Sequence, residues 1–337
     1  MFIKNSKFNS RKEGTHMKAS GQNQVSTQNS IPTVPITKKS LWKRIVECKA
    51  LYFFLLPSLV YLFIFHYIPM YGVQIAFRNF NPALGFTGSP WVGLQHFKDF
   101  VTGYYFWPII RNTLTISFYS LLTFPIPIIL ALMLNEIRSY KYKKFVQTVL
   151  YAPHFISTVV LIGMVNLILS PSTGIVNHLL AALGFERQYF MIQPQAFKHI
   201  YVWSGVWQGS GWSAIIYLAA LSAVDPELHE AATIDGASRL QRIRYINIPT
   251  IKPTVIILLI MSIGSLVNIG YEKAYLLQND LNLEMSEIIS TYVYRRGLLK
   301  ASYSFSTAVS LFNSIINIIL LVTANFISRK LGETSLF

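Results

Sequence analysis

The chain carries, at residues 51–73, the stretch LYFFLLPSLVYLFIFHYIPMYGV, which contains no Asp, Glu, Lys or Arg. An α-helix rises about 1.5 Å per residue, so about 20 apolar residues cross the hydrocarbon core of a bilayer, which is roughly 30 Å thick. This stretch is therefore predicted to be a membrane-spanning helix.

Five more stretches share this length and apolar character, and they lie at 109–134, 148–170, 200–222, 253–271 and 305–327. None contains Asp, Glu or Lys, and the one Arg among them, Arg111, lies at the edge of its stretch. Strands of a membrane β-barrel need far fewer residues, about 9–11 each. The predicted fold is an all-α polytopic membrane protein with six transmembrane helices.

The composition agrees with this class. Of the 337 residues, 52% are hydrophobic and 13% are charged, whereas a soluble domain carries about 25% charged residues. The 29 Lys and Arg outnumber the 14 Asp and Glu, which gives a formal charge of +15. Together with the apolar excess, this charge indicates contact with membrane lipids rather than with nucleic acid. The single cysteine, Cys48, cannot form an internal disulfide.

The cations divide unevenly across the predicted membrane. If the N-terminus, the loops after the second and fourth helices, and the C-terminus share one side, that side holds 20 of the 29 Lys and Arg. Loops rich in Lys and Arg stay in the cytoplasm. Both termini are therefore predicted to be cytoplasmic.

The N-terminal segment 1–40 is rich in Ser, Asn, Gln and Thr and has little to bury. It is predicted to be a disordered cytoplasmic tail, and residues 41–337 are predicted to form one six-helix transmembrane domain. The sequence Gly-Thr-His-Met at 14–17 looks like a cloning remnant. Residues 1–16 are therefore either native or an extension before a natural start near Met17.

The sequence contains no motif for catalysis or cofactor binding. There is no G-x-x-x-x-G-K-[ST] phosphate-binding loop and no dinucleotide fingerprint, and the seven His residues lack metal-binding spacing. No acidic residue lies in a predicted span, whereas ion-coupled transporters usually carry one there. We predict no cofactor, no metal and no enzymatic activity, and a pathway whose energy comes from another subunit.

The loop between the fourth and fifth predicted helices, 223–250, contains DPELHEAATIDGAS, beginning at Asp225. Asp225 is a suitable N-cap, and Pro226 follows at the first helical position. Gly236 is suited to end this helix in a left-handed conformation, and the serine two residues later can cap a second helix. Pro249 is expected to end that second helix. The loop is therefore predicted to form a helix, a turn and a second helix.

The same loop resembles the signature loop of the membrane subunits of binding-protein-dependent ABC importers, which reads E-A-A, three residues, G, nine residues, I-x-L-P. The chain matches this pattern at every fixed position except Ile248, where Leu is usual. The resemblance implies a type I importer permease fold, whose cytoplasmic coupling helix lies in a cleft of the ATPase subunit. The residues that it assigns to this coupling are Glu230, Ala231, Ala232, Asp235, Gly236, Ile246 and Pro249.

From about Leu51 to Phe337 the chain is similar to the polysaccharide-type branch of these permeases, most of all to the first permease subunit of importers of acidic oligosaccharides such as alginate. The resemblance implies a multi-pass subunit of a bacterial cytoplasmic (inner) membrane, which forms half of an alternating-access pathway for an oligosaccharide. Its implied partners are a second permease subunit, an ATPase subunit dimer and an extracytoplasmic solute-binding protein. The alternatives are an integral-membrane enzyme that acts on a lipid-linked or glycan substrate, and a scaffolding membrane protein.

A pathway for sugars needs aromatic faces and hydrogen-bonding groups. The fourth and fifth predicted spans supply such residues, and the candidates are Trp207, Gln208, Trp212, Ser262, Ser265, Asn268 and Tyr271. At helical spacing, Gln208 and Trp212 share a face, as do Ser265 and Asn268. Gly205 and Gly209 offer the alternative that the fourth helix packs closely against another helix.

Overall fold

The computed structural model describes residues 49–332 and 334–336. The predicted tail at 1–40 therefore lies outside the described residues. The chain divides into two compact units, Met1–Leu62 and Phe63–Phe337. In the first unit the described residues form one helix, α2 (Lys49–Leu62), which has no charged residue after its first position.

The described residues are mostly helical, and the one pairing of extended segments among them is an isolated bridge between Arg78 and Trp91. This confirms the predicted all-α membrane fold. Four continuous helical segments could cross a membrane, and the bent pair Tyr140–Phe155 and Thr158–Ile168 can be counted as a fifth span. The continuous helical segments that are long and apolar enough to cross a membrane are Lys49–Phe77, Phe106–Asn135, Arg239–Gly264 and Tyr303–Lys330.

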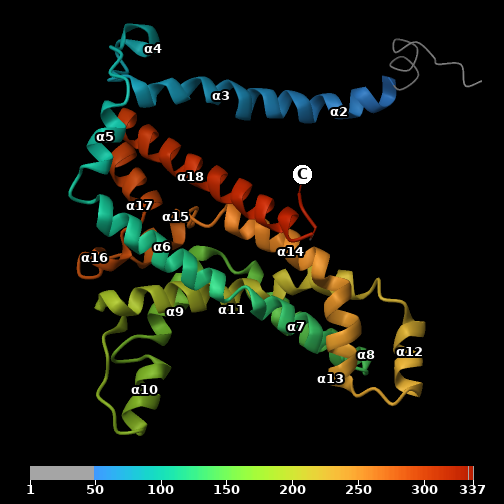
Figure 1. The fold of residues 1–337 in the computed structure, drawn as a ribbon. Coiled ribbons are helices and arrows are strands. Elements are labelled where there is room, and N and C mark those ends of the chain that lie inside the picture. The colour runs from blue at the N-terminus through green and yellow to red at the C-terminus, as the bar shows by residue number, and fades with distance from the viewer. Residues whose placement is uncertain (1–48, 333, 337) are drawn as a thin grey trace, which may run out of the picture. The chain divides into compact units, whose positions relative to one another are not determined.

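In the second unit, long helices are joined by short helices and turns (Figure 1). The α-helices are α3 (Ile68–Met70), α4 (Gly85–Gly88), α5 (Gln95–Val101), α6 (Phe106–Leu122), α7 (Pro125–Asn135), α8 (Tyr140–Tyr151), α9 (Thr158–Ile168), α10 (Ile175–Ala182), α11 (Pro194–Leu221), α12 (Pro226–Ile234), α13 (Arg239–Arg242), α14 (Ile248–Gly264), α15 (Tyr271–Leu277), α16 (Leu283–Ser286), α17 (Ile289–Tyr294) and α18 (Tyr303–Lys330). The 3₁₀ and π-helical turns are Phe63–Tyr67, Tyr71–Phe77, Ala152–Phe155, Phe190–Ile192, Ile243–Asn247 and Arg295–Leu299.

The segment at 148–170 is not one straight helix, which corrects the prediction. The helical segment Tyr140–Phe155, which contains α8, and the helix α9 are bent by 101° relative to each other. Pro153 lies in the turn between them, and the hydroxyl of Ser157 caps α9 by accepting a hydrogen bond from the amide of Val160. A proline removes an amide donor and a capping serine starts a new helix, so these two residues bend the segment.

The helix predicted at 253–271 is also shorter than expected at its C-terminal end. α14 ends at Gly264, where a Cβ would lie 2.5 Å from a side-chain atom of Leu321 on α18. The glycine therefore allows the end of α14 to approach α18 closely. An irregular segment follows, and Tyr271 begins the separate helix α15.

α11 is the central helix of the second unit, in contact with α6, α7, α8 and α14. It has 28 residues and contains the predicted span 200–222. It is less apolar than the four continuous spans, because Ser, Gly and Gln residues interrupt its apolar sequence. Six transmembrane helices therefore remain a prediction.

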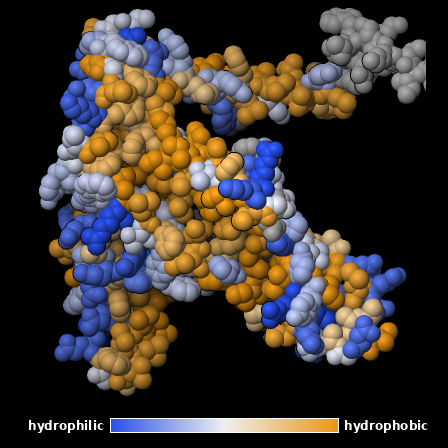
Figure 2. Space-filling view, viewed as in Figure 1, coloured by the Kyte–Doolittle hydropathy of each residue, from blue (hydrophilic) through white to orange (hydrophobic). Residues whose placement is uncertain are grey.

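Two buried apolar clusters lie along α11. The first joins Phe197 and Val202 to neighbours on α6, α9 and α15. The second joins Ala214, Tyr217 and Leu221 to residues of α7 and α14. On the face drawn in Figure 2, apolar residues cover much of the long helices of this unit. The two clusters hold the surrounding helices against α11 near both of its ends.

Candidate functional site

The loop 223–250 forms a helix, a turn and a second helix, as predicted, at one end of the second unit (Figure 1). The carboxylate of Asp225 accepts a hydrogen bond from the amide of Glu227 (3.0 Å), and Pro226 begins α12. The carboxylate satisfies an amide that has no partner within the helix, and the proline has no amide to satisfy. The start of α12 is therefore fixed by local sequence.

Gly236 ends α12 in the left-handed conformation, with a φ of +79°. Its amide donates to the carbonyl of Thr233 (3.1 Å), and the amide of Ala237 donates to the carbonyl of Ala232 (2.8 Å). These are the two hydrogen bonds of a Schellman motif. A Cβ at Gly236 would have no described atom within 4 Å, so glycine is required here for its backbone conformation and not for space.

The second helix continues into α14, which corrects the prediction that Pro249 ends it. Ser238 and Gln241 form a capping box at its start. From there one helical segment, Arg239–Gly264, runs through a π-helical turn and across the whole of α14. Pro249 lies in the first turn of α14. The π-helical turn changes the hydrogen-bonding pattern just before the proline, which has no amide to donate.

The surface of this loop combines apolar and charged side chains. Leu228, Ile234 and Leu240 are 55%, 86% and 77% exposed, and Figure 2 shows apolar and polar residues interleaved around α12 and α13. The guanidinium of Arg242 donates to the hydroxyl of Thr233 (2.5 Å), which ties α13 to α12. An exposed apolar patch with a polar rim is typical of a protein–protein interface.

The residues assigned to coupling lie on this same surface or at its base. Two of them, Ala232 and Ile246, are half-buried. The others are exposed, and they are Glu230, Ala231, Asp235, Gly236 and Pro249. The loop therefore presents a carboxylate and small side chains beside the exposed apolar residues.

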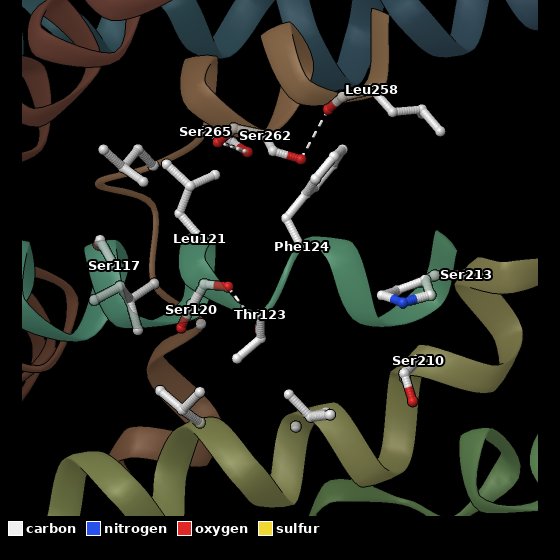
Figure 3. Close-up of a pocket in the computed structure, with 18 of the residues that line it drawn as sticks. Ser117, Ser120, Leu121, Thr123, Phe124, Ser210, Ser213, Leu258, Ser262 and Ser265 are labelled. Carbon is white, nitrogen blue, oxygen red and sulfur yellow. Dashed lines mark hydrogen bonds between the residues drawn. The ribbon is translucent and has the colours of Figure 1, made fainter. Parts of the chain in front are cut away.

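A cavity of about 530 Å³ lies between α6, α7, α11 and α14, and Figure 3 shows part of its lining. The hydroxyl of Ser262 donates to the carbonyl of Leu258 (2.8 Å), so its lone pairs remain free to accept. The hydroxyl of Ser117 is buried and has no hydrogen-bond partner among the described residues. The polar residues that line the cavity include Ser117, Ser120, Thr123, Ser210, Ser213, Ser262, Ser265 and Asn268.

The cavity contains three of the seven predicted pathway residues, Ser262, Ser265 and Asn268. The last two lie beyond the end of α14 rather than on one helical face. Trp207 does not line the cavity and is 48% exposed. Tyr271 does not line it either, because its ring stacks on that of Tyr294 on α17, with 5.2 Å between the ring centres.

Gln208 and Trp212 lie on a packing face of α11, outside the cavity lining. The amide of Gln208 donates to the carbonyl of Ile156 (2.8 Å), and the ring of Trp212 stacks on that of His154, 4.5 Å away. Both residues therefore hold α11 against the connection between α8 and α9. Close helix packing at Gly205 and Gly209 was the alternative to a pathway role. The close approach occurs instead at Gly211, whose Cβ would clash with the backbone of Leu150 on α8.

Lys273 is a cavity residue that the sequence did not reveal. It lies on α15, in a segment that follows the predicted fifth span. Burial lowers the pKa of Lys273 to about 8. In sequence, a lysine just beyond an apolar stretch cannot be distinguished from a cation that only sets topology. Within residues 49–332 and 334–336, no group of three or more His, Cys, Asp or Glu side chains could hold a metal ion.

Comparison with known proteins places this geometry in a family. Residues 100–333 match the family described as binding-protein-dependent transport system inner membrane component. The chain is 42% identical over 301 residues to the polygalacturonan/rhamnogalacturonan transport system permease protein YteP of Bacillus subtilis (strain 168), which covers 89% of this chain and 94% of that protein. It is 44% identical over 290 residues to protein LplB of the same organism, and the match covers 86% of this chain and 91% of that protein.

Solved structures agree with these relatives. A chain in the crystal structure of a bacterial ABC transporter involved in the import of the acidic polysaccharide alginate has a TM-score of 0.80 and 42% identity, over 87% of this chain and 99% of that one. A chain in the crystal structure of a bacterial alginate ABC transporter in complex with an alginate pentasaccharide-bound periplasmic protein also has a TM-score of 0.80 and 42% identity, over 88% of this chain and 99% of that one. The chain therefore belongs to the family of binding-protein-dependent transport system inner membrane components, and it is a non-catalytic, multi-pass permease subunit of an ABC importer.

Proposed function

We propose that this chain forms one half of the membrane pathway of an importer for an acidic oligosaccharide, and that the loop 223–250 couples this pathway to ATP hydrolysis on another subunit. One observation carries the proposal: the loop joins α11 directly to α14, and these two helices form walls of the cavity. A movement of the loop is therefore transmitted to the lining of the pathway without an intervening element.

The substrate class is supported by the relatives and by the cavity. One relative is named for polygalacturonan and rhamnogalacturonan transport, and the solved transporter imports alginate. Hydroxyl and amide groups on the cavity wall can replace water around the hydroxyls of a sugar. Lys273, which lines the same cavity, can form a charge-assisted hydrogen bond with a sugar that carries a carboxylate.

The coupling residues have distinct proposed roles. Glu230 supplies the charged contact to the ATPase subunit, whereas Ala231 and Ala232 allow its surface to approach α12 closely. Gly236 forms the turn. Asp235 extends the polar rim of the docking surface, and Ile246 and Pro249 anchor the loop to α14.

The proposed assembly contains a second permease subunit, an ATPase subunit dimer and an extracytoplasmic solute-binding protein. The solved complex with a periplasmic protein supports the last of these partners. We also propose six spans with both termini in the cytoplasm, which requires α11 and the bent pair α8–α9 to cross the membrane together with the four continuous segments. The excess of Lys and Arg on one side supports this orientation.

The Glu230→Lys variant tests the coupling proposal. In proteoliposomes that contain the whole importer, it should lower oligosaccharide uptake and substrate-stimulated ATPase activity together, because a lysine repels the cationic group expected on the partner. Glu186→Lys is the matched control, since Glu186 is an exposed acid outside the loop. Parental uptake and ATPase activity in the Glu230→Lys variant would show that this residue makes no coupling contact.

A further inference from the structure

The ammonium group of Lys273 is held in a defined position in the cavity wall. Its Nζ donates to the carbonyl of Tyr201 (2.7 Å) and lies 4.7 Å from the centre of the ring of the same tyrosine. An ammonium group has three donors, and the carbonyl uses one of them. The side chain is therefore oriented by α11 and keeps two donors for another group.

Within residues 49–332 and 334–336, the charge of Lys273 has no anionic partner. Among the residues that the structure describes, no Asp or Glu forms an ion pair with it, and the adjacent acid, Glu272, is exposed. A partly desolvated cation without an anion is unfavourable. The ammonium can therefore accept an anionic partner from the cavity that it lines.

Gly205 leaves the space that the ammonium occupies. A Cβ at this position would lie 2.9 Å from Nζ of Lys273, which is closer than the two groups can approach without a shift. One turn further along α11, Gly209 also lines the cavity and has no described atom within 4 Å of its ideal Cβ position. The absence of two side chains therefore keeps the floor of the cavity open beside the charge.

We propose that Lys273 is the carboxylate-binding residue of the pathway, and that its two remaining donors hold the carboxylate of a uronic acid unit as the oligosaccharide passes. This inference rests on the proposed import of an acidic oligosaccharide and adds the residue that recognises the acid. Polygalacturonan and alginate are polymers of uronic acids, so each sugar unit carries a carboxylate. A neutral sugar would leave the ammonium without an anion, whereas a uronic acid supplies one in a charge-assisted hydrogen bond.

The test compares two substrates in the complete importer, reconstituted in proteoliposomes with its solute-binding protein. One is an oligogalacturonide, and the other is its methyl ester, which has the same sugars without the charge. Uptake by Lys273→Met, Lys273→Arg and Gly205→Ala is expressed relative to the parent for each substrate, which removes the preference of the binding protein. Lys300→Met is the control, because Lys300 is an exposed lysine outside the cavity.

We expect Lys273→Met to lower relative uptake of the acid by about tenfold to a hundredfold, with relative uptake of the ester unchanged. Lys273→Arg should retain most of the acid uptake, whereas Gly205→Ala should lose part of it because the Cβ displaces the ammonium. Acid uptake by Lys273→Met within twofold of the parent would overturn the assignment. An equal loss for acid and ester in both Lys273 variants would also overturn it, since that is the result of a structural role. If the parent imports neither substrate, the proposed function fails and this assignment fails with it.

Discussion

Replacement of Gly236 by alanine isolates the conformational role of the turn between α12 and α13. Its φ of +79° lies in the left-handed region, which costs a residue with a side chain about 1–2 kcal/mol. No described atom lies within 4 Å of the added Cβ, so this strain is the entire cost. A penalty of that size shifts the equilibrium between the native and the opened turn by about 5- to 30-fold.

The expected result is a loss of coupling without a loss of assembly. In proteoliposomes, substrate-stimulated ATPase activity and uptake should fall together, by up to about thirtyfold, because the strain opens the turn that carries the coupling surface. The amount of complex recovered in detergent should not change, since the substituted residue is exposed and touches no helix of the membrane core.

Gly184 provides a matched control for this experiment. It has a φ of +83° and no described atom within 4 Å of its ideal Cβ position, and it ends α10 with the same pair of hydrogen bonds. Gly184→Ala therefore introduces the same strain away from the coupling loop. If Gly184→Ala and Gly236→Ala have equal effects on ATPase activity and uptake, the reasoning that the turn of the loop transmits motion is refuted.

Two further predictions concern the helices around the cavity. Gly211→Ala should lower the stability of the complex by about 1–3 kcal/mol or more, because the added Cβ would clash with the backbone carbonyl of Leu150. Thermal unfolding in detergent measures this loss of stability. Gly163→Ala is the control and should not lower the stability, because the space around its Cβ position is open. Uptake of an acidic oligosaccharide should fall as the pH rises from about 7 to 9, because burial lowers the pKa of Lys273 to about 8 and the side chain loses its charge over this range. The Lys273→Arg variant should show no such fall, and a parent profile that is flat across this range would contradict the assignment.

The sequence predicted the coupling loop in detail because its structure is local. An N-cap aspartate, a proline after it and a glycine at the end of the helix each act within a few residues. The hydrogen bonds observed at Asp225 and Gly236 follow directly from these residue types. Pro249 was misjudged, because a π-helical turn lets the chain absorb a proline that ordinarily ends a helix.

The cavity was predicted less well, because its lining depends on how the helices pack. Apolar runs indicate where helices form but not which face of α11 meets α8. The sequence therefore did not show that the pathway candidates Gln208 and Trp212 contact the connection between α8 and α9. The C-terminal end of α14 was predicted too far along the chain, because the contact of Gly264 with α18 has no signature in the sequence. Lys273 enters the cavity because α15 folds back against α9 and α11 after α14 ends, and no local pattern encodes that return.

The uninterrupted helical segment Arg239–Gly264 can convert a small tilt at the loop into a larger displacement at its other end. A rod of 26 residues is about 39 Å long, so a tilt of about 10° about one end moves the other by about 7 Å. That displacement approaches the spacing of about 8–10 Å between the axes of packed helices. A rocking of the loop by this angle would therefore displace the far end of α14, where the cavity residues Ser262 and Ser265 lie, by nearly the spacing between two packed helices.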